Sequence, residues 1–391
     1  MFNRILLVFL ALGVLGSNAF ASRASNIVMG TGDAGVILNG GSFYYDDNYN
    51  MFYNPAYIND FKNYAIIEKS NFPGNTAQGG FVTSAGNVVL GFYFNRGNAV
   101  VTTPGASGTA GGNNIAANPV LGANTNAFGV SQPNRPIEVF AGTDLGAAKV
   151  GVGLTYAQNT TASQQATVLV GHLGVEYMGF DPFVNGDIVA NDNGANLSHN
   201  YLNAGLRYHF GEFVPYFAVF YASDSALSTN VALPNAVYKE LNIGGGIGRT
   251  TRVAEGVRMN YGVSYFAVND TTAIGGTPTR ILLPIDISME ADALTWLTVR
   301  AGLGYRLIDK TNSISAADNA SGRVGVTAHV GKADIEWALG RSFNPASNQE
   351  SNTGGTGVAA PTAPPANLPY DSQGVDIGAQ FFSAVNVAYH W

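Results

Sequence analysis

The sequence predicts an all-β chain that crosses a membrane as a single closed antiparallel β-barrel. Apolar and polar residues alternate over most of the chain, short and long connections alternate along it, and charged residues make up only 12% of it. A typical soluble protein has about 25% charged residues. In hydrocarbon every backbone amide must be paired within the protein, and a closed sheet achieves this with only half of its side chains apolar.

The first residues have the pattern of a secretory signal. One positive charge, at Arg4, precedes an unbroken apolar run over residues 5–16. This run is shorter than the about 20 residues that a spanning helix needs. Residues 19–21, Ala-Phe-Ala, offer the small residues that a signal peptidase recognises. We therefore expect residues 1–21 to be a signal peptide and the mature chain to be exported.

Sixteen segments show the period-two alternation of β-strands. In one of them Met259, Tyr261 and Val263 share an apolar face, while Asn260 and Gly262 lie on the other face. Fourteen strands are the alternative, because the first segment and the one that contains a proline alternate least clearly. We place the strands at 62–70, 77–84, 87–95, 136–144, 148–157, 165–177, 180–190, 200–209, 213–223, 237–249, 256–269, 279–290, 294–307, 322–330, 333–340 and 376–391.

The connections between these strands fall into two alternating classes. Seven are short turns, and the other eight are mostly longer polar loops. Short periplasmic turns and long external loops are typical of bacterial outer-membrane barrels. The two longest loops, 96–134 and 341–375, are rich in small residues and proline and would suit interdomain linkers in another context. Strand patterning resumes after each of them, which favours a single barrel over residues 62–391.

The last predicted strand ends in aromatic residues. Its apolar face is formed by Phe381, Val385, Val387, Tyr389 and Trp391. This ending resembles the C-terminal strand of bacterial outer-membrane proteins, which closes on an aromatic residue with a second one two positions earlier. The resemblance implies recognition by the barrel assembly machinery and a final location in the outer membrane, among its lipids. A soluble β-sandwich or barrel is the alternative, but its exposed face would carry charge, whereas the second face here holds mostly small and uncharged residues.

Residues 22–61 lack clean alternation. They contain glycines at 30, 32 and 35, and Asn54, Pro55 and Ala56 shortly before the first strand. This combination resembles the N-terminal region of the long-chain fatty-acid transporter (FadL-type) family, in which the region forms a hatch that plugs a barrel of usually fourteen strands. Here Tyr57-Ile58 replaces the family's usual Gly-Leu. The resemblance implies a plug-like segment over 22–61.

The same glycines also match the G-x-G-x-x-G pattern of dinucleotide-binding sites. That pattern signals a nucleotide only where a strand precedes it and a helix follows within a βαβ unit. No such unit follows here, so we interpret the glycines as backbone that bends within a crowded lumen.

The polar face of the strands is expected to point into the lumen, and its charged members make a mixed wall. In a water-filled pore, separated charges of both signs orient small polar solutes and tune ion preference. The alternative is that they form salt bridges that stiffen the barrel and anchor the plug. The segment 213–221 is apolar on both faces, as a hydrophobic substrate or a packed plug would require. The channel-lining candidates are Arg207, Arg258, Arg300, Arg306, Arg323, Glu138, Glu240, Asp286, Glu290, Asp334, Glu336 and Asp376.

We expect no enzyme, cofactor or metal site. The chain has no cysteine, and its five histidines are dispersed without ligand spacing. No serine, histidine and acid grouping stands out in the sequence, although a triad assembled only in space stays open. The net charge of −7 argues against nucleic acid as a partner.

The sequence favours an outer-membrane, porin-like channel for passive or facilitated diffusion of small solutes. One alternative is transport of hydrophobic molecules in the manner of the FadL-type family. Another is a structural or surface-recognition barrel that acts through its long external loops. A homo-oligomer is compatible with each of these functions.

Overall fold

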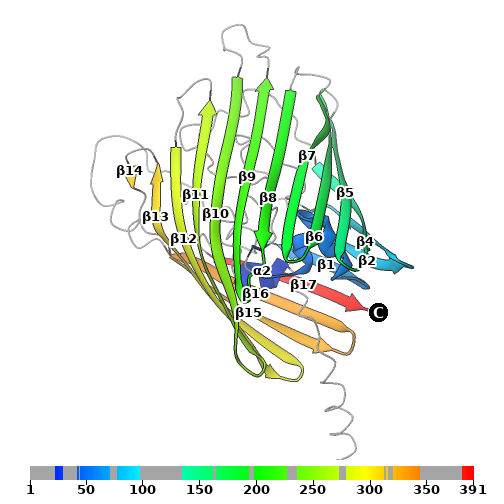
Figure 1. Cartoon of the computed structure of the whole chain (residues 1–391), viewed down its shortest axis with the longest axis vertical. Helices are drawn as coiled ribbons and strands as arrows, with labels where there is room; N and C mark the ends of the chain where they lie inside the picture. The colour runs from blue at the N-terminus through cyan, green and yellow to red at the C-terminus, as the bar shows by residue number, and fades with distance from the viewer. Residues whose placement is uncertain are drawn as a thin grey trace, which may run out of the picture.

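The wall of the molecule is one antiparallel sheet that closes on itself (Figure 1). Each strand pairs with the next one along the chain, and the last pairs with the first through Tyr64↔His390 and Ser70↔Ala384. Closure of this kind leaves no sheet edge with unpaired amides. The computed structural model describes residues 23–29, 42–43, 45–70, 77–96, 134–161, 164–192, 198–226, 236–272, 279–311, 314–315, 320–343 and 381–391. The expected signal peptide lies outside these residues.

Sixteen long strands form the described wall, and a two-residue strand, β14 (Ile314–Ser315), pairs with the end of β13. The long strands are β1 (Tyr64–Ser70), β2 (Gln78–Ala85), β3 (Val88–Phe94), β4 (Asn134–Asp144), β5 (Ala148–Thr161), β6 (Gln164–Tyr177), β7 (Phe180–Asp192), β8 (Ser198–Tyr208), β9 (Phe213–Ala226), β10 (Ala236–Ala254), β11 (Val257–Thr272), β12 (Thr279–Leu294), β13 (Leu297–Thr311), β15 (Ala320–Val330), β16 (Ala333–Phe343) and β17 (Phe381–His390).

The predicted sixteen-strand barrel is confirmed, and the fourteen-strand alternative is wrong. The two segments with the weakest alternation are the strands β1 and β7. β10 and β12 run further toward the turns than the sequence predicted, to Ala254 and Leu294. Both strands carry a register shift near that end. A bulge breaks the period of two, so the alternation ends before the strand does.

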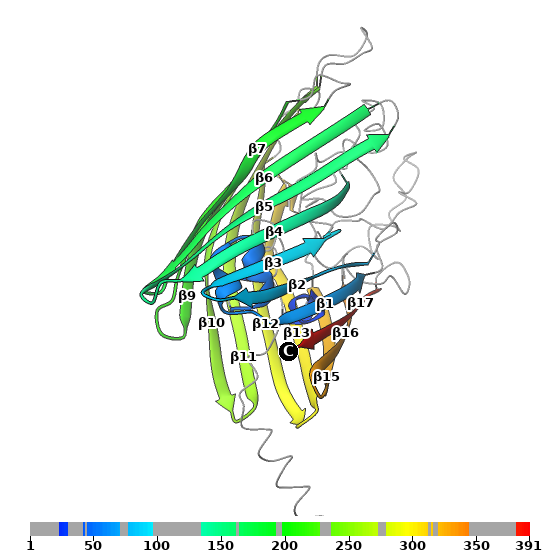
Figure 2. The ribbon, with the colours of Figure 1, turned by 90° about the vertical axis from the view of Figure 1, so that its right-hand side faces the viewer.

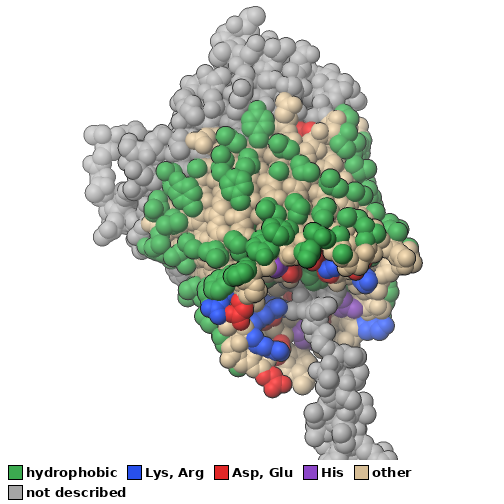
Figure 3. Space-filling model, in the orientation of Figure 1, with side chains coloured by type: hydrophobic (Ala, Val, Ile, Leu, Met, Phe, Trp, Pro, Cys, Tyr) green, Lys and Arg blue, Asp and Glu red, His purple; other side chains and the backbone are tan. Residues whose placement is uncertain are grey.

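The outward face of the barrel is apolar and exposed. On β11, Val263 and Tyr265 are exposed, whereas Asn260 and Ser264 face inward and are buried. Figure 3 shows the hydrophobic side chains as a belt over the strands, with charged side chains gathered below it. A closed barrel of an even number of strands with an outward apolar band is the architecture of bacterial outer-membrane proteins. The protein is therefore an outer-membrane β-barrel.

The C-terminal strand presents its aromatic ending to the outside. Val385, Val387, Tyr389 and Trp391 are all exposed on the outer face, as the sequence predicted. Phe381 begins β17, but its side chain lies outside the described part of the structure. Within the described residues, no helix is long and apolar enough to cross a membrane.

The N-terminal residues form short helices on the inner side of the strands (Figure 2). The α-helix α2 (Arg23–Met29) packs against β12, β13 and β15 to β17, and the 3-10 helix η3 (Pro55–Asn59) packs against β3 to β6. A second 3-10 helix, η2 (Asn48–Phe52), packs on η3. All side chains from residue 47 to residue 59 are buried. We refer to the described residues 42–43 and 45–61 as the inner segment.

A lipid-facing charge tests the inside–outside assignment. Leu303, near the middle of β13, is 65% exposed, and Leu294, at the periplasmic end of β12, is 50% exposed. We expect Leu303→Arg to destabilise the barrel by about 2–4 kcal/mol and Leu294→Arg by about 0–1 kcal/mol, because the penalty for arginine depends on its depth in the bilayer. Reversible denaturant unfolding in lipid vesicles measures both. Equal penalties would contradict the assignment.

Candidate functional site

The Asn-Pro-Ala motif begins η3 at the wall of the barrel. Asn54 is the N-cap residue: its Oδ1 accepts a hydrogen bond from the backbone N–H of Ala56 at 3.1 Å, and Pro55 occupies the first helical position. Asparagine at the N-cap and proline next to it are favourable choices for a helix start. The Asn54 amide nitrogen also donates to the carbonyl of Val175 on β6 at 3.2 Å. One side chain thus starts the helix and joins it to the wall.

Two glycines of the wall make room for this motif. Gly151 on β5 and Gly174 on β6 are register partners and both face inward. A Cβ at Gly151 would overlap the backbone carbonyl of Pro55, and one at Gly174 would overlap the Asn54 side chain. Gly302 on β13 is similarly close to the backbone of helix α2. The wall and the N-terminal helices are therefore fitted to each other at backbone distance.

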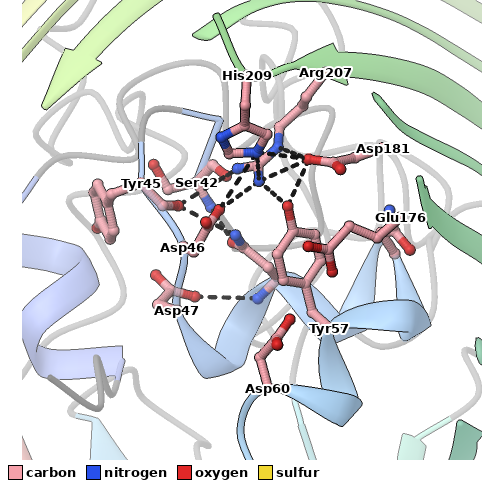
Figure 4. Close-up of polar contacts among 12 residues, drawn as sticks. Ser42, Tyr45, Asp46, Asp47, Tyr57, Asp60, Glu176, Asp181, Arg207 and His209 are labelled. Carbon is pink, nitrogen blue, oxygen red and sulfur yellow. Dashed lines mark hydrogen bonds and ion pairs between the residues drawn. The ribbon is translucent and has the colours of Figure 1, made fainter. Parts of the chain in front are cut away.

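Arg207 on β8 joins the inner segment to the wall most extensively (Figure 4). Its guanidinium is wholly buried and pairs with the Asp181 carboxylate on β7 at 3.1 Å. From the same group, Nη2 lies 2.5 Å from the Asp46 carboxylate and Nη1 donates to the Ser42 carbonyl at 3.0 Å. Nη2 also donates to the hydroxyl of Tyr57, which in turn donates to Asp181 at 2.6 Å. A buried charge needs such partners to compensate its desolvation.

His209 completes this cluster at the turn between β8 and β9. Its Nε2 lies 2.8 Å from the Asp181 carboxylate and 3.0 Å from Nη2 of Arg207. The hydrogen bond with Asp181 raises the pKa of His209. Burial raises the pKa of Tyr57 well above its usual range, so its hydroxyl keeps its proton. We refer to Asp46, Tyr57, Asp181, Arg207 and His209 as the anchor cluster.

Lys149 provides a second attachment near the C-terminal end of the inner segment. Its ammonium lies 2.5 Å from the carboxylate of Asp60 and 3.1 Å from that of Glu176. The Asn59 amide donates to the Val150 carbonyl at 3.2 Å. Because these groups are partly exposed, removing one of them should cost less stability than removing a member of the buried Arg207–Asp181 pair.

A buried polar chain supports the inner segment from a third side. Arg96 forms two hydrogen bonds to the Glu138 carboxylate, at 2.7 and 2.6 Å. The chain continues through Thr155, His172 and Asn185, whose amide donates to the carbonyl of Tyr53 at 3.1 Å. The Thr155 hydroxyl, the His172 imidazole and the Asn185 amide stand in the order of a nucleophile, a base and an orienting group. All three side chains are buried, and the chain ends on the inner segment.

Five charged candidates on β11, β12, β13 and β15 are held in ion pairs. Glu290 is shared by Arg258 at 2.6 Å and Arg300 at 2.5 Å. Arg323 pairs with Asp286 at 2.8 Å. These five residues therefore form the salt bridges that the sequence analysis gave as the alternative.

The remaining charged candidates are placed as follows. Arg306 and Glu336 are buried, and Glu336 lies 3.9 Å from Arg300. Asp334 lies at the rim between two histidines, His329 at 2.7 Å and His390 at 3.1 Å. Glu240 lies on β10 with its side chain outside the described part, and Asp376 lies outside the described residues altogether. In the described part of the chain, no group of three or more His, Cys, Asp and Glu side chains is arranged to hold a metal ion.

Aromatic contacts cover the apolar side of the inner segment. Phe43 stacks on Tyr216 of β9, with ring centroids 3.9 Å apart and planes at 9°. Tyr53 meets Phe183 edge to face at 4.9 Å. Within the segment 213–221, which is apolar on both faces, the inward Tyr216 thus receives the ring of Phe43. Further inward apolar side chains belong to the same cluster: Val168, Val170, Tyr201, Phe220, Phe266 and Leu282.

No protein-family model matches the sequence, and no curated protein matches it. Solved structures similar to this chain include OmpT of Vibrio cholerae expressed in the outer membrane, with 10% identity and a TM-score of 0.40 over 79% of this chain and 100% of that one. A FadL homologue of Pseudomonas aeruginosa has 11% identity and a TM-score of 0.43 over 93% of this chain and 98% of that one. OccK9 of Pseudomonas aeruginosa has 10% identity and a TM-score of 0.30 over 84% and 95%. These similarities carry no argument about function.

The close packing of the Asn-Pro-Ala motif on Gly151 can be tested with one methyl group. We expect Gly151→Ala to destabilise the protein by about 1–3 kcal/mol through overpacking, and to expose the inner segment to proteolysis. Gly171→Ala is the matched control, because its Cβ would approach the flexible side chain of Ile188 on the neighbouring strand, and the nearest backbone atom, the Gly186 oxygen, is 3.9 Å away. Denaturant unfolding and limited proteolysis of both variants measure the difference. Two variants that behave alike would show that the inner segment is not fitted to the wall at Gly151.

The anchor cluster can be tested by comparing a buried arginine with an exposed one. Arg207→Met leaves the buried carboxylate of Asp181 without its cation, and we expect a loss of about 3–5 kcal/mol. Arg249→Met removes the partner of Glu212 at an exposed rim position and should leave stability nearly unchanged. Unfolding curves of the two variants measure the contrast. A small effect of Arg207→Met would refute the anchoring role.

Proposed function

We propose that this protein is an outer-membrane channel for small solutes, and that residues 22–61 form a plug that narrows or closes its lumen. The observation that carries the proposal is the buried inner segment, which reaches the wall through the anchor cluster, the Lys149 ion pairs and the Tyr53 carbonyl. Barrels of about sixteen strands enclose more space than their own side chains fill. These attachments are the contacts that opening of the lumen would break.

The charged inward residues would then line the solute path beside the plug. Burial raises the pKa of Tyr45 in the inner segment, and the positive charges of Arg258, Arg300 and Arg323 act against this rise. Their carboxylate partners give this side of the lumen charges of both signs, which suits polar solutes better than a single class of ion. Arg258 is the most exposed of the three, at 36% of its side chain.

Transport rather than catalysis is the function that we infer. The Thr155 hydroxyl lies between Glu138 and His172 and is enclosed, so that a substrate has no access to it in this arrangement. The outward aromatic residues Tyr389 and Trp391 are the groups that we assign to recognition by the barrel assembly machinery.

Transport of hydrophobic molecules is the second candidate function. It is favoured by the inward apolar cluster around Phe220, Phe266 and Leu282, which extends beyond the rings that touch the inner segment. An apolar fluorescent probe distinguishes the two candidates. Saturable binding that Phe220→Ser weakens at least several-fold would favour the hydrophobic path, whereas permeation of small sugars without probe binding would favour the polar one.

Planar-bilayer conductance tests the channel itself. We expect the full-length protein to open rarely or with small steps, and the protein without residues 22–61 to give steady ohmic openings. Heat-modifiable migration of both proteins in gels is the control that the barrel has formed. A folded barrel that conducts in neither form would exclude the channel function.

A further inference from the structure

One oxygen of Asp181 receives more hydrogen-bond donors than it can hold at once. Its Oδ2 lies 2.6 Å from the Tyr57 hydroxyl, 2.8 Å from Nε2 of His209, and 3.1 and 3.3 Å from two nitrogens of Arg207. A carboxylate oxygen has two lone-pair directions. The other oxygen, Oδ1, is buried and has no hydrogen-bond partner in the described part of the chain. These donors therefore compete at Oδ2.

The protonation state of His209 changes the charge at this crowded site. A protonated Nε2 donates to Asp181, and the imidazolium adds a positive charge 4.0 Å from Asp46. A neutral ring has no charge to attract Asp46, and in its Nδ1–H tautomer Nε2 accepts from Arg207 instead of donating to Asp181. His209 lies at the turn between β8 and β9 and is 31% exposed, so it can exchange protons with the periplasm. Asp46 and Tyr57 belong to the inner segment, and Asp181 and Arg207 belong to the wall.

We propose that His209 is a proton-operated latch that holds the inner segment to the wall when protonated and releases it when neutral. The proposal rests on the proposed function, in which the inner segment closes the lumen.

The direction in which pH shifts the docking equilibrium follows from the charged groups around the His209 imidazole. The hydrogen bond with Asp181 raises the pKa of His209, burial and Arg207 act against it, and Asp46 raises it further. The contribution of Asp46 exists only while the inner segment is docked, because Asp46 lies on that segment. Protonation of His209 then favours docking at low pH, and this contribution is lost as the pH rises through the raised pKa of the docked state. Each pKa unit gained on docking changes the docking equilibrium by up to about tenfold.

A second group titrates in the same direction and has to be separated from His209. Burial raises the pKa of Asp47, which caps helix η2 by accepting hydrogen bonds from the backbone of Tyr49 and Asn50. Its ionisation at high pH would also favour release. Asp47→Asn keeps an oxygen for the cap and removes the titration, so it isolates this contribution.

Labelling of a single cysteine measures docking directly. The chain has no cysteine, and Met51 is wholly buried in the inner segment, so Met51→Cys reports release as maleimide labelling in proteoliposomes. Lys332→Cys, in an exposed turn, corrects for the intrinsic pH dependence of the thiol reaction. Ile58→Cys is a second reporter in case Met51→Cys misfolds. We expect the corrected rate to increase several-fold between about pH 5.5 and pH 8.5.

Three further variants decide the outcome. His209→Gln should abolish the pH dependence, with rapid labelling at every pH, whereas His329→Gln, a rim histidine paired with Asp334, should leave it intact. The latch is overturned if labelling does not vary with pH, or if His209→Gln keeps the variation and Asp47→Asn removes it. Conductance recorded on the same proteins separates the two proposals: pH-dependent labelling without any conductance would refute the channel and leave the latch standing.

Discussion

The arrangement inside the barrel depends on one buried charge, the guanidinium of Arg207. A cation enclosed in protein is stable only where anions and carbonyl groups replace its water. On the wall side, Asp181 and His209 lie within hydrogen-bond distance of this guanidinium. The inner segment supplies three further groups: the carboxylate of Asp46, the hydroxyl of Tyr57 and the carbonyl of Ser42. Because the wall alone does not complete this shell, the inner segment and the barrel stabilise each other.

The glycines of the neighbouring strands follow from the same constraint. Tyr57 reaches the anchor cluster from helix η3, and this helix begins at Asn54, against Gly174 and Gly151. A side chain at either glycine would displace the helix from the wall and carry Tyr57 away with it. The same short helix is therefore held by packing on the two glycines at Asn54 and by the anchor cluster at Tyr57.

Much of the fold could be predicted from the sequence, because apolar and polar residues alternate along a strand that has one face on lipid and the other on the lumen. The same alternation predicted that Arg207 lies on the inward face. It could not show which residues Arg207 contacts. Its pairing with Asp181 depends on the register of β7 and β8, which alternation within each strand does not fix. Asp46 is 161 positions away in the chain and lies in a segment without periodicity.

The sequence predicted which side chains point into the lumen, but not which of them form ion pairs or pack together. Alternation predicts Arg300 and Glu290 only as two lining charges, whereas in the structure they form an ion pair at 2.5 Å. The doubly apolar stretch around Tyr216 was compatible with a hydrophobic substrate or with a packed plug, and the stacking of Phe43 on Tyr216 accounts for part of it by packing.

Hydrogen exchange of the inner segment tests the central claim most directly. The backbone amides of Tyr49, Asn50 and Ala56 donate to the side chains of Asp47 and Asn54 in a buried environment. In the full-length protein in lipid these amides should exchange slowly, and in Arg207→Met they should exchange much faster while the strands stay protected. Rapid exchange in the unaltered protein, or slow exchange that Arg207→Met leaves unchanged, would contradict the dependence of the inner segment on this one buried charge.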